Sequence, residues 1–203
     1  MLIIGLTGPS GAGKGVVASL FAAYGVPSID TDAVYHELLI PPSICLDELA
    51  ARFGSAVLHD DGTLNRKALA TIVFAPGHDH DRLDLNRISH RHVLNRVREL
   101  LASYDSAGRS AILVDAPQLF ESGFDAECDV ILSVLASRDV RLSRIMARDG
   151  LDETAALARI NAQKDDEFFR KHSHDIVINN GSVDNLDADV RRFLTKWEVQ
   201  HEA

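Results

Sequence analysis

The sequence predicts an α/β protein built on a five-stranded parallel sheet. Three observations carry this prediction: short apolar runs rich in β-branched residues, helical periodicity between these runs, and a regular alternation of the two patterns. The runs at 110–117 and 128–137 are apolar and β-branched, which is typical of strands covered on both faces. With 203 residues, of which 46% are apolar, the chain is long enough to bury the core that this architecture needs.

Five segments have the composition of such strands. Turn-forming residues bound them, and helical patterns separate one from the next. The predicted strands cover residues 2–7, 26–30, 110–117, 128–137 and 174–179.

The predicted helices rest on apolar spacings of three and four residues and on polar residues at capping positions. Asn65, Ser137, Asp152 and Ser182 are the expected N-caps, and Gly150 is expected to end a helix. The helices cover 14–24, 43–53, 65–74, 79–106 and 138–149, and others start near residue 31 and after residues 152 and 182. We expect the 79–106 helix to break near His90.

Residues 36–109 are almost entirely helical and connect the second predicted strand to the third. A crossover between parallel strands needs only a dozen residues or somewhat more. We therefore expect a helical subdomain inserted into one domain of 203 residues.

The composition limits the partners of the protein. A net charge of −9 argues against a broad nucleic-acid or membrane surface. Cys45 and Cys128 lack metal-type spacing, and no apolar run is long enough for a membrane span. We expect a cytoplasmic protein with a small-molecule substrate and without nucleic-acid or membrane partners, and the oligomeric state stays open.

A glycine-rich turn follows the first predicted strand. Gly8, Gly13 and Lys14 match the phosphate-binding pattern G-x-x-x-x-G-K where this strand passes into a helix. Glycines let backbone N–H groups converge on phosphate oxygens, and the helix N-terminus adds the positive end of its dipole. Lys14 adds a point charge for the β- and γ-phosphates. The predicted nucleotide-binding residues are Gly11, Ala12, Gly13, Lys14, Gly15 and Val16.

Gly15 departs from this pattern, which has Ser or Thr after the lysine. The hydroxyl at that position is the usual magnesium ligand of the loop, and neither Gly15 nor Val16 supplies one. Magnesium often keeps several waters and is held largely by the nucleotide. We therefore expect a nucleotide with a magnesium ion held through water, and the metal ligands of the protein stay undefined.

Asp30 and Asp32 follow the second predicted strand, whose carboxyl end lies at the ligand-binding edge of a parallel sheet. In one interpretation Asp30 ends the strand and Asp32 caps the next helix. In the other, a carboxylate here accepts a proton from an attacking hydroxyl group. Position alone favours neither interpretation.

Arg141, Arg144 and Arg148 are spaced three and four residues apart and share one face of the predicted 138–149 helix. Such a face can be a solvated stripe. Phosphoryl transfer, however, needs cations over the transferred group and an element that excludes water. Arginines gathered on one helix of an acidic protein favour this functional interpretation.

Further motifs follow the GLTG run and the GK loop in a fixed order. They are GVPSIDTD, L-N-x-I-x-H from Leu85, DAPQLFE from Asp115, M-x-R-x-G from Met146, R-I-x-x-Q from Arg159, and a D-x-V-I run from Asp175 with Asn179 or Asn180 and Gly181. Together they resemble the dephospho-coenzyme A kinase family over nearly the whole chain. Arg91 departs from the family pattern, which has a proline after the histidine.

The resemblance implies a P-loop kinase core of residues 1–35, 110–137 and 174–203, a helical coenzyme A subdomain of residues 36–109, and a helical lid of residues 138–173. It implies transfer of the γ-phosphate of ATP to the ribose 3′-hydroxyl of dephospho-coenzyme A, the last step of coenzyme A synthesis. Another small-molecule or nucleoside monophosphate kinase, or a regulatory nucleotide-binding protein without turnover, remains the alternative.

The resemblance also implies roles for individual residues. Asp32 would be the general base, and Lys14 and Arg148 would act on the phosphates. The remaining residues would bind ligands: Arg144 and Asn180 the nucleotide, and His90 and Glu121 the acceptor.

Overall fold

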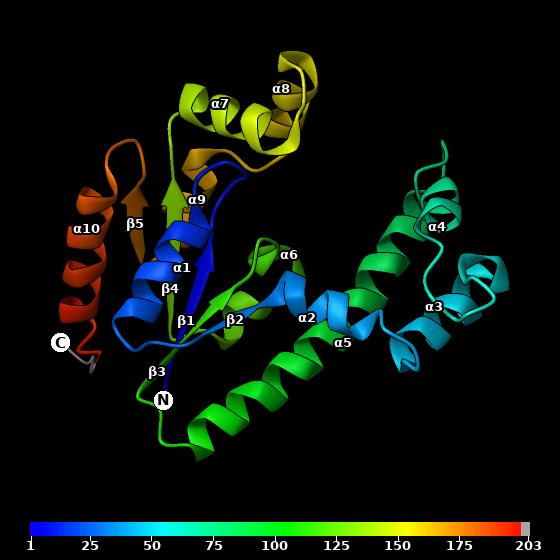
Figure 1. Ribbon diagram of the computed structural model, residues 1–203, viewed down its shortest axis with the longest axis horizontal. Coiled ribbons are helices and arrows are strands. Elements are labelled where there is room, and N and C mark those ends of the chain that lie inside the picture. Colours follow the sequence, from blue (N-terminus) through cyan, green and yellow to red (C-terminus); the bar gives the residue numbers. More distant parts are fainter. Residues whose placement is uncertain (200–203) are drawn as a thin grey trace. The chain divides into compact units, whose positions relative to one another are not determined.

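The computed structural model describes residues 1–199, and within them five strands form one sheet of order β2-β3-β1-β4-β5 (Figure 1). The strands are β1 (Leu2–Thr7), β2 (Ser28–Asp30), β3 (Ala111–Asp115), β4 (Val130–Leu135) and β5 (Asp175–Ile178). The β1–β3, β1–β4 and β4–β5 pairs are parallel, with Leu6 opposite Asp115 and Thr7 opposite Ser133. The predicted five-stranded parallel sheet is confirmed, with strand ends that differ by up to two residues from those expected.

Helices connect the strands along the whole described chain. The longer ones are α1 (Lys14–Ala23), α2 (Thr31–Leu38), α3 (Ile44–Phe53), α4 (Arg66–Val73), α5 (Asp79–Ser106), α7 (Arg138–Asp149), α8 (Glu153–Asn161) and α10 (Val183–Lys196). The shorter ones are η1 (Ser55–Val57), α6 (Leu119–Ser122), η2 (Phe124–Glu127) and α9 (Asp166–His172).

The chain divides into two compact units. Unit 1 contains residues 1–29 and the chain from residue 104 onward, and unit 2 contains residues 30–103. The predicted helical subdomain, residues 36–109, covers most of unit 2. The finer division of unit 1 into core and lid at residues 138 and 174 stays a prediction, and residues 200–203 of the predicted core lie outside the described part.

The core of unit 1 lies between the sheet and two helices. Val17 and Phe21 of α1 and Val190 and Phe193 of α10 pack against the sheet residues Ile4, Leu6, Leu113, Leu132 and Val134. The rings of Phe21 and Phe193 meet edge to face at 5.5 Å, so the two helices also contact each other. This packing fixes the carboxyl edge of the sheet, from which the glycine-rich loop emerges.

Segment α7–α8 has a small core of its own, formed by Ile145, Ala156 and Ile160. Asp152 caps α8 as predicted, because its carboxylate accepts a hydrogen bond from Ala155 N–H (2.8 Å). Ser137 stands at the N-cap of α7 as predicted, but its side chain makes no capping hydrogen bond. Its own backbone N–H instead donates to Asn180 Oδ1 at 2.7 Å, so a distant loop holds this helix start.

Unit 2 contains a second core, which includes Leu46, Leu49, Val57 and Ile88. The expected break near His90 is wrong, because α5 runs unbroken for 28 residues. Position 91 is an arginine, so the helix keeps a backbone donor that a proline would remove. The Arg91 side chain bonds to Glu48 of α3 and so ties α5 to α3. Although α5 is long, none of the described helices combines the length and apolar character needed to cross a membrane.

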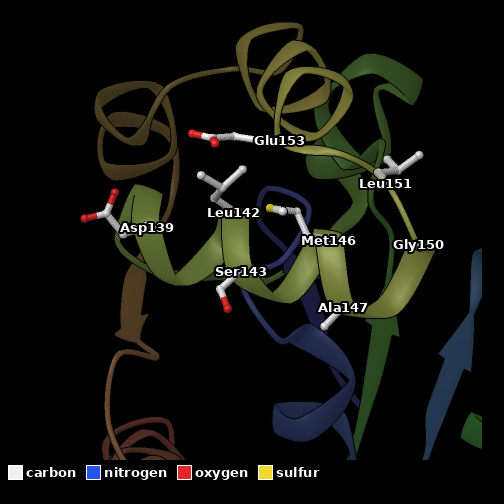
Figure 2. A pocket seen from close by; sticks show the side chains of 8 residues that line it. All are labelled: Asp139, Leu142, Ser143, Met146, Ala147, Gly150, Leu151 and Glu153. Carbon is white, nitrogen blue, oxygen red and sulfur yellow. The ribbon is translucent and has the colours of Figure 1, made fainter.

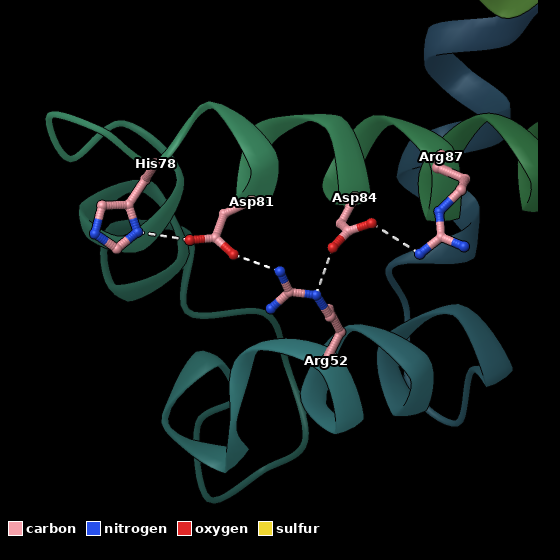
Figure 3. Close-up of polar contacts among 5 residues, drawn as sticks. All are labelled: Arg52, His78, Asp81, Asp84 and Arg87. Atoms are coloured by element: carbon pink, nitrogen blue, oxygen red, sulfur yellow. Dashed lines mark hydrogen bonds and ion pairs between the residues drawn. The ribbon is translucent and has the colours of Figure 1, made fainter.

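A charged network also joins α3 to α5 (Figure 3). The Arg52 guanidinium donates to Asp84 Oδ2 at 2.7 Å and to Asp81 Oδ1 at 2.5 Å. His78 lies against Asp81, and Arg87 lies against Asp84. Hydrogen bonds from His78 and Arg52 lower the pKa of Asp81, and bonds from Arg52 and Arg87 lower that of Asp84.

We expect this network to make the free energy of unfolding of unit 2 decrease as the pH falls. Carboxyl groups whose pKa is lowered by folding stabilise the protein above their unfolded pKa, near 3.9 for Asp, and this contribution is lost as the pH falls through the folded pKa. Arg52→Met should therefore lower the urea midpoint at about pH 7 and change it little at about pH 2. Equilibrium unfolding monitored by circular dichroism measures both midpoints.

Arg82→Met is the matched control, since within residues 1–199 Arg82 pairs only with exposed Asp79, one turn away on the same helix. Such an exposed pair contributes little, so this variant should follow the wild type at both pH values. An Arg52→Met deficit that persists at low pH would contradict the assignment of the acid effect to this network.

Candidate active site

The glycine-rich loop joins β1 to α1 and closes on itself. The N–H of Ala12 donates to the Pro9 carbonyl at 3.2 Å, and Gly13 stands at the N-cap of α1 with a left-handed backbone (φ 94°). A Cβ at Gly13 would collide with the Asn179 amide, so only glycine fits there. Gly8 and Gly11 also have positive φ, which is the backbone that the phosphate-binding pattern predicts.

Lys14 and Gly15 open the first turn of α1. Lys14 Nζ donates to the Gly8 carbonyl at 3.2 Å, which holds the ammonium group against the loop. Gly15 is exposed, and a Cβ built on it would meet no heavy atom within 4 Å. Sterics therefore do not require glycine at position 15, and the space that a Ser or Thr hydroxyl would fill is open.

Three arginines of α7 bind the loop from one side. Arg141 Nε donates to the Ser10 carbonyl (3.0 Å), and Arg148 Nη2 donates to Ser10 Oγ (3.3 Å). Arg144 Nη1 lies 3.3 Å from the carbonyl oxygens of both Gly11 and Ala12. The shared helix face is thus confirmed, and it faces the loop. Arg141 is only 5% exposed, which rules out a solvated stripe at that residue.

Asn179 connects the end of β5 to the same loop. Its Nδ2 donates to the Ala12 carbonyl (2.8 Å), and its Oδ1 accepts from Arg144 Nη2 (3.1 Å). The sequence pattern does not distinguish Asn179 from Asn180, and the family resemblance implies that Asn180 binds the nucleotide. The buried Asn179 is the residue that contacts the loop, whereas Asn180 is exposed and holds the start of α7.

Arg148 is held in place by its neighbour Asp149. The carboxylate accepts from Arg148 Nε at 2.8 Å and Nη2 at 2.9 Å, and it also pairs with Arg159. The bond to Arg148 is the main cause that lowers the pKa of Asp149, and the same bond raises the pKa of Arg148. The Arg148 side chain is 60% exposed, so its ion pair with Asp149 contributes little to stability. A phosphate group can therefore replace Asp149 as the partner of Arg148 at little cost.

Segment α7–α8 also borders an open groove of about 760 Å³ (Figure 2). Its volume is within the range of ligand sites, about 300–1,000 Å³. Its residues are mainly apolar, among them Leu142, Met146 and Leu151, and its charged groups are the carboxylates of Asp139 and Glu153. Without a lining cation, this groove does not suit a polyphosphate, and the loop remains the candidate phosphate site.

Asp115 is a further candidate residue, to which the sequence motifs assign no role. It ends β3, the neighbour of β1, and lies opposite Leu6 just before the loop. Because side chains alternate along a strand, Asp115 shares a face with Leu113, which packs with α1. The signal was an apolar strand ending in Asp, AILVD. In the sheet, β3 lies directly beside β1, which leads into the loop, and β2 lies one strand further away. Asp115 at the end of β3 is therefore closer to β1 in strand order than Asp30 at the end of β2.

The structure separates the two carboxylates after β2. Asp30 is the N-cap of α2, and its Oδ1 accepts from the N–H groups of Asp32 (2.9 Å) and Ala33 (3.2 Å). The interpretation in which Asp32 is the cap is therefore wrong. Asp32 is exposed in the first turn of α2, and within residues 1–199 its carboxylate makes no hydrogen bond or ion pair. This leaves it available for another role.

The two predicted acceptor residues belong to different units. His90 is half-buried on α5 in unit 2, and Glu121 is exposed on α6 in unit 1. Their roles, like that of Asp32 in unit 2, remain proposals.

Comparison with known proteins decides the family. A family model described as dephospho-CoA kinase matches residues 2–185. The dephospho-CoA kinase of Syntrophotalea carbinolica is 37% identical over 197 residues, which cover 97% of this chain and 92% of that protein. The chain belongs to the dephospho-CoA kinase family. It is accordingly an enzyme, a kinase of coenzyme A synthesis, as the sequence motifs predicted.

Solved structures agree with the dephospho-CoA kinase fold. The crystal structure of TT1252 from Thermus thermophilus has a TM-score of 0.80 and 30% identity, covering 96% of this chain and 97% of that one. The dephospho-CoA kinase from Campylobacter jejuni has a TM-score of 0.70 and 24% identity, with 96% of each chain covered. The P-loop kinase fold is therefore confirmed.

Proposed function

We propose that this dephospho-CoA kinase transfers the γ-phosphoryl group of ATP to the ribose 3′-hydroxyl of dephospho-CoA. The observation that carries the proposal is the glycine-rich loop with Lys14, closed from one side by Arg144 and Arg148 of α7. Backbone donors, a helix N-terminus and fixed cations are the groups that bind and stabilise transferring phosphates.

In this proposal Gly11–Val16 cradle the polyphosphate, and Lys14 binds the β- and γ-phosphates. Asn180 and Arg144 bind the nucleotide. Arg148 leaves Asp149 and contacts the γ-phosphate when α7 closes as part of a lid. Asp32 accepts the proton of the 3′-hydroxyl. The oxygen of that hydroxyl bonds to the γ-phosphorus as the bond to the β-phosphate oxygen breaks, which leaves ADP and coenzyme A. His90 and Glu121 bind the acceptor.

The residues fit a magnesium ion held by ATP and water. No group of three metal-binding side chains occurs among the residues that the structure describes, so these residues offer no metal cage of their own. The open space at Gly15 has room for water, and half-buried Asp115 provides a carboxylate on the same face of the sheet as α1. Asp115 and the backbone near Gly15 would hold water ligands of the ion, which neutralises phosphate charge when bound.

The proposed reaction is tested by phosphoryl transfer from ATP to dephospho-CoA, AMP, shikimate and gluconate across a magnesium titration. We expect transfer to dephospho-CoA alone and none without a divalent cation. Failure to phosphorylate dephospho-CoA would reject the substrate, and turnover without divalent cations would reject the metal.

Gly15→Ser should lower the magnesium concentration needed for half-maximal activity by roughly three- to tenfold, since a direct ligand is regained. Gly15→Ala is the matched control. Both replacements should stabilise α1 by about 0.5–1 kcal/mol, because a helical glycine is lost, and only Ser should change the magnesium requirement. Equal magnesium curves for the two variants would contradict a water-mediated ion at this position.

A further inference from the structure

Ser10 of the glycine-rich loop is held at each of its polar groups by a side chain from the segment α7–α8 and its C-terminal extension. Gln163, just after α8, accepts from Ser10 N–H through Oε1 at 3.0 Å. Arg141 Nε donates to the Ser10 carbonyl at 3.0 Å, and Arg148 Nη2 donates to Ser10 Oγ at 3.3 Å. Gln163 and Arg141 also bond to each other, because the same Oε1 accepts from Arg141 Nη2 at 3.1 Å.

These bonds determine where neighbouring N–H groups point. The peptide unit is planar and trans, so a carbonyl and the following N–H point in opposite directions. Fixing the Ser10 carbonyl on Arg141 therefore directs Gly11 N–H away from α7. The Ser10 N–H points at Gln163 Oε1. This hydrogen bond fixes the orientation of the peptide unit between Pro9 and Ser10. The orientation of two peptide units in the loop thus depends on two side chains outside it.

The glycine-rich loop packs tightly against α7. A Cβ on Gly11 would lie 2.8 Å from the Arg141 carbonyl oxygen, so the loop packs directly on the backbone of α7. Arg141 is 5% exposed, and Asp166 Oδ1, with which it forms an ion pair, is 3.9 Å away. In the described part of the chain, Asp166 at this longer distance is the only carboxylate paired with the Arg141 guanidinium, and burial lowers the pKa of Arg141. A buried cation bonded to the loop adds to the positive potential there.

We propose that Gln163 and Arg141 are positioning residues for ATP, which act through Ser10 to aim the N–H groups of the loop at the phosphates. The proposal rests on the nucleotide site proposed above and adds residues that do not themselves touch the nucleotide. It gives a use to the glutamine of the R-I-x-x-Q motif, which the proposed reaction leaves unexplained.

A purely structural role for Gln163 would lower folding stability when the side chain is replaced, whereas a positioning role would weaken ATP binding. Gln163 is exposed, so water can replace its amide at Ser10 N–H when the side chain is removed. Folding stability should then change little, while the loop loses its fixed orientation and binding becomes weaker. ATP affinity and unfolding temperature therefore separate the two roles.

The test is calorimetric titration of Mg·ATP, without acceptor, into the wild type, Gln163→Met and Gln163→Asn. Methionine keeps the length and lacks the acceptor, and asparagine keeps the amide but is one methylene shorter. The matched control is Asn161→Leu, because Asn161 Oδ1 accepts from Arg138 Nη2 (3.0 Å), which links α8 to α7 without touching the loop.

We expect both Gln163 variants to bind ATP about five- to tenfold more weakly, the effect of one lost hydrogen bond. Asn161→Leu should bind within about twofold of the wild type, and the unfolding temperatures without ATP should agree within about 2 °C. Wild-type affinity in Gln163→Met, or equal weakening in Asn161→Leu, would overturn the proposal. A Lys14→Met variant that binds ATP normally would instead overturn the nucleotide site itself, and this inference with it.

Discussion

Replacing Asp32 with asparagine is expected to lower kcat by roughly 10²–10⁴ while ATP affinity stays within about twofold of the wild type. The amide keeps the size of the side chain and cannot accept the proton of the 3′-hydroxyl. Asp32 makes no hydrogen bond or ion pair with its side chain in the described part of the chain, so the change removes no stabilising contact. Steady-state kinetics with dephospho-CoA and calorimetry with ATP measure the two quantities.

Asp30→Asn is the matched control for this experiment. Asp30 caps α2 through Oδ1, and an asparagine caps a helix equally well. The control should retain kcat within about threefold of the wild type. An Asp32→Asn enzyme with turnover within about tenfold of the wild type would show that Asp32 is not the general base.

Replacing Arg148 with methionine is the second change with a large expected effect. Arg148 is exposed and bonded to Asp149 and Ser10, which keeps its guanidinium at the loop. Loss of a preorganised cation over the transferring group typically costs about 10²–10³ in kcat. Arg148→Lys should recover only part of this loss, since an ammonium group cannot bind a phosphate in the bidentate way.

Arg138→Met provides the control on the same helix. Arg138 donates to Asn161 on α8 and makes no bond to the loop among the described contacts. Its removal should leave kcat within about twofold of the wild type. Equal losses in the two variants would show that α7 needs only its general positive charge, and would remove the specific role of Arg148.

The elements predicted most accurately are those whose signals are local. β1 and α7 have the predicted bounds, and Asn65, Asp152 and Ser182 cap their helices through their side chains. Periodicity and capping act over a few residues, so a linear pattern contains them completely. Two failures were also local, since Asp30 rather than Asp32 caps α2 and no proline follows His90 to break α5. Elsewhere, distant residues hold the predicted elements. Asn180 satisfies Ser137 N–H, and Arg91 bonds to Glu48 in a helix that does not break.

The residues of the candidate site also fall into those that local spacing predicts and those that distant parts of the chain contribute. The loop glycines, Lys14 and the arginine face of α7 were readable from spacing, because each lies within one turn or one helix. Asn179, Gln163 and Asp115 were not assigned roles, since each reaches the loop or its strand from a distant part of the chain. Asn179 had a signal in the Asn-Asn pair, but only the hydrogen bonds to Ala12 and Arg144 distinguish it from Asn180.

The sequence by itself determined that this protein has a phosphate-binding loop, because such a loop needs a strand, particular glycines and a lysine at fixed spacing. The family followed from the order of its motifs along the chain. Only the tertiary structure decided which asparagine holds the loop, and that Ser10 is bound by Gln163 and Arg141. These outcomes depend on hydrogen bonds between groups that folding brings together, and no local pattern in the chain encodes them.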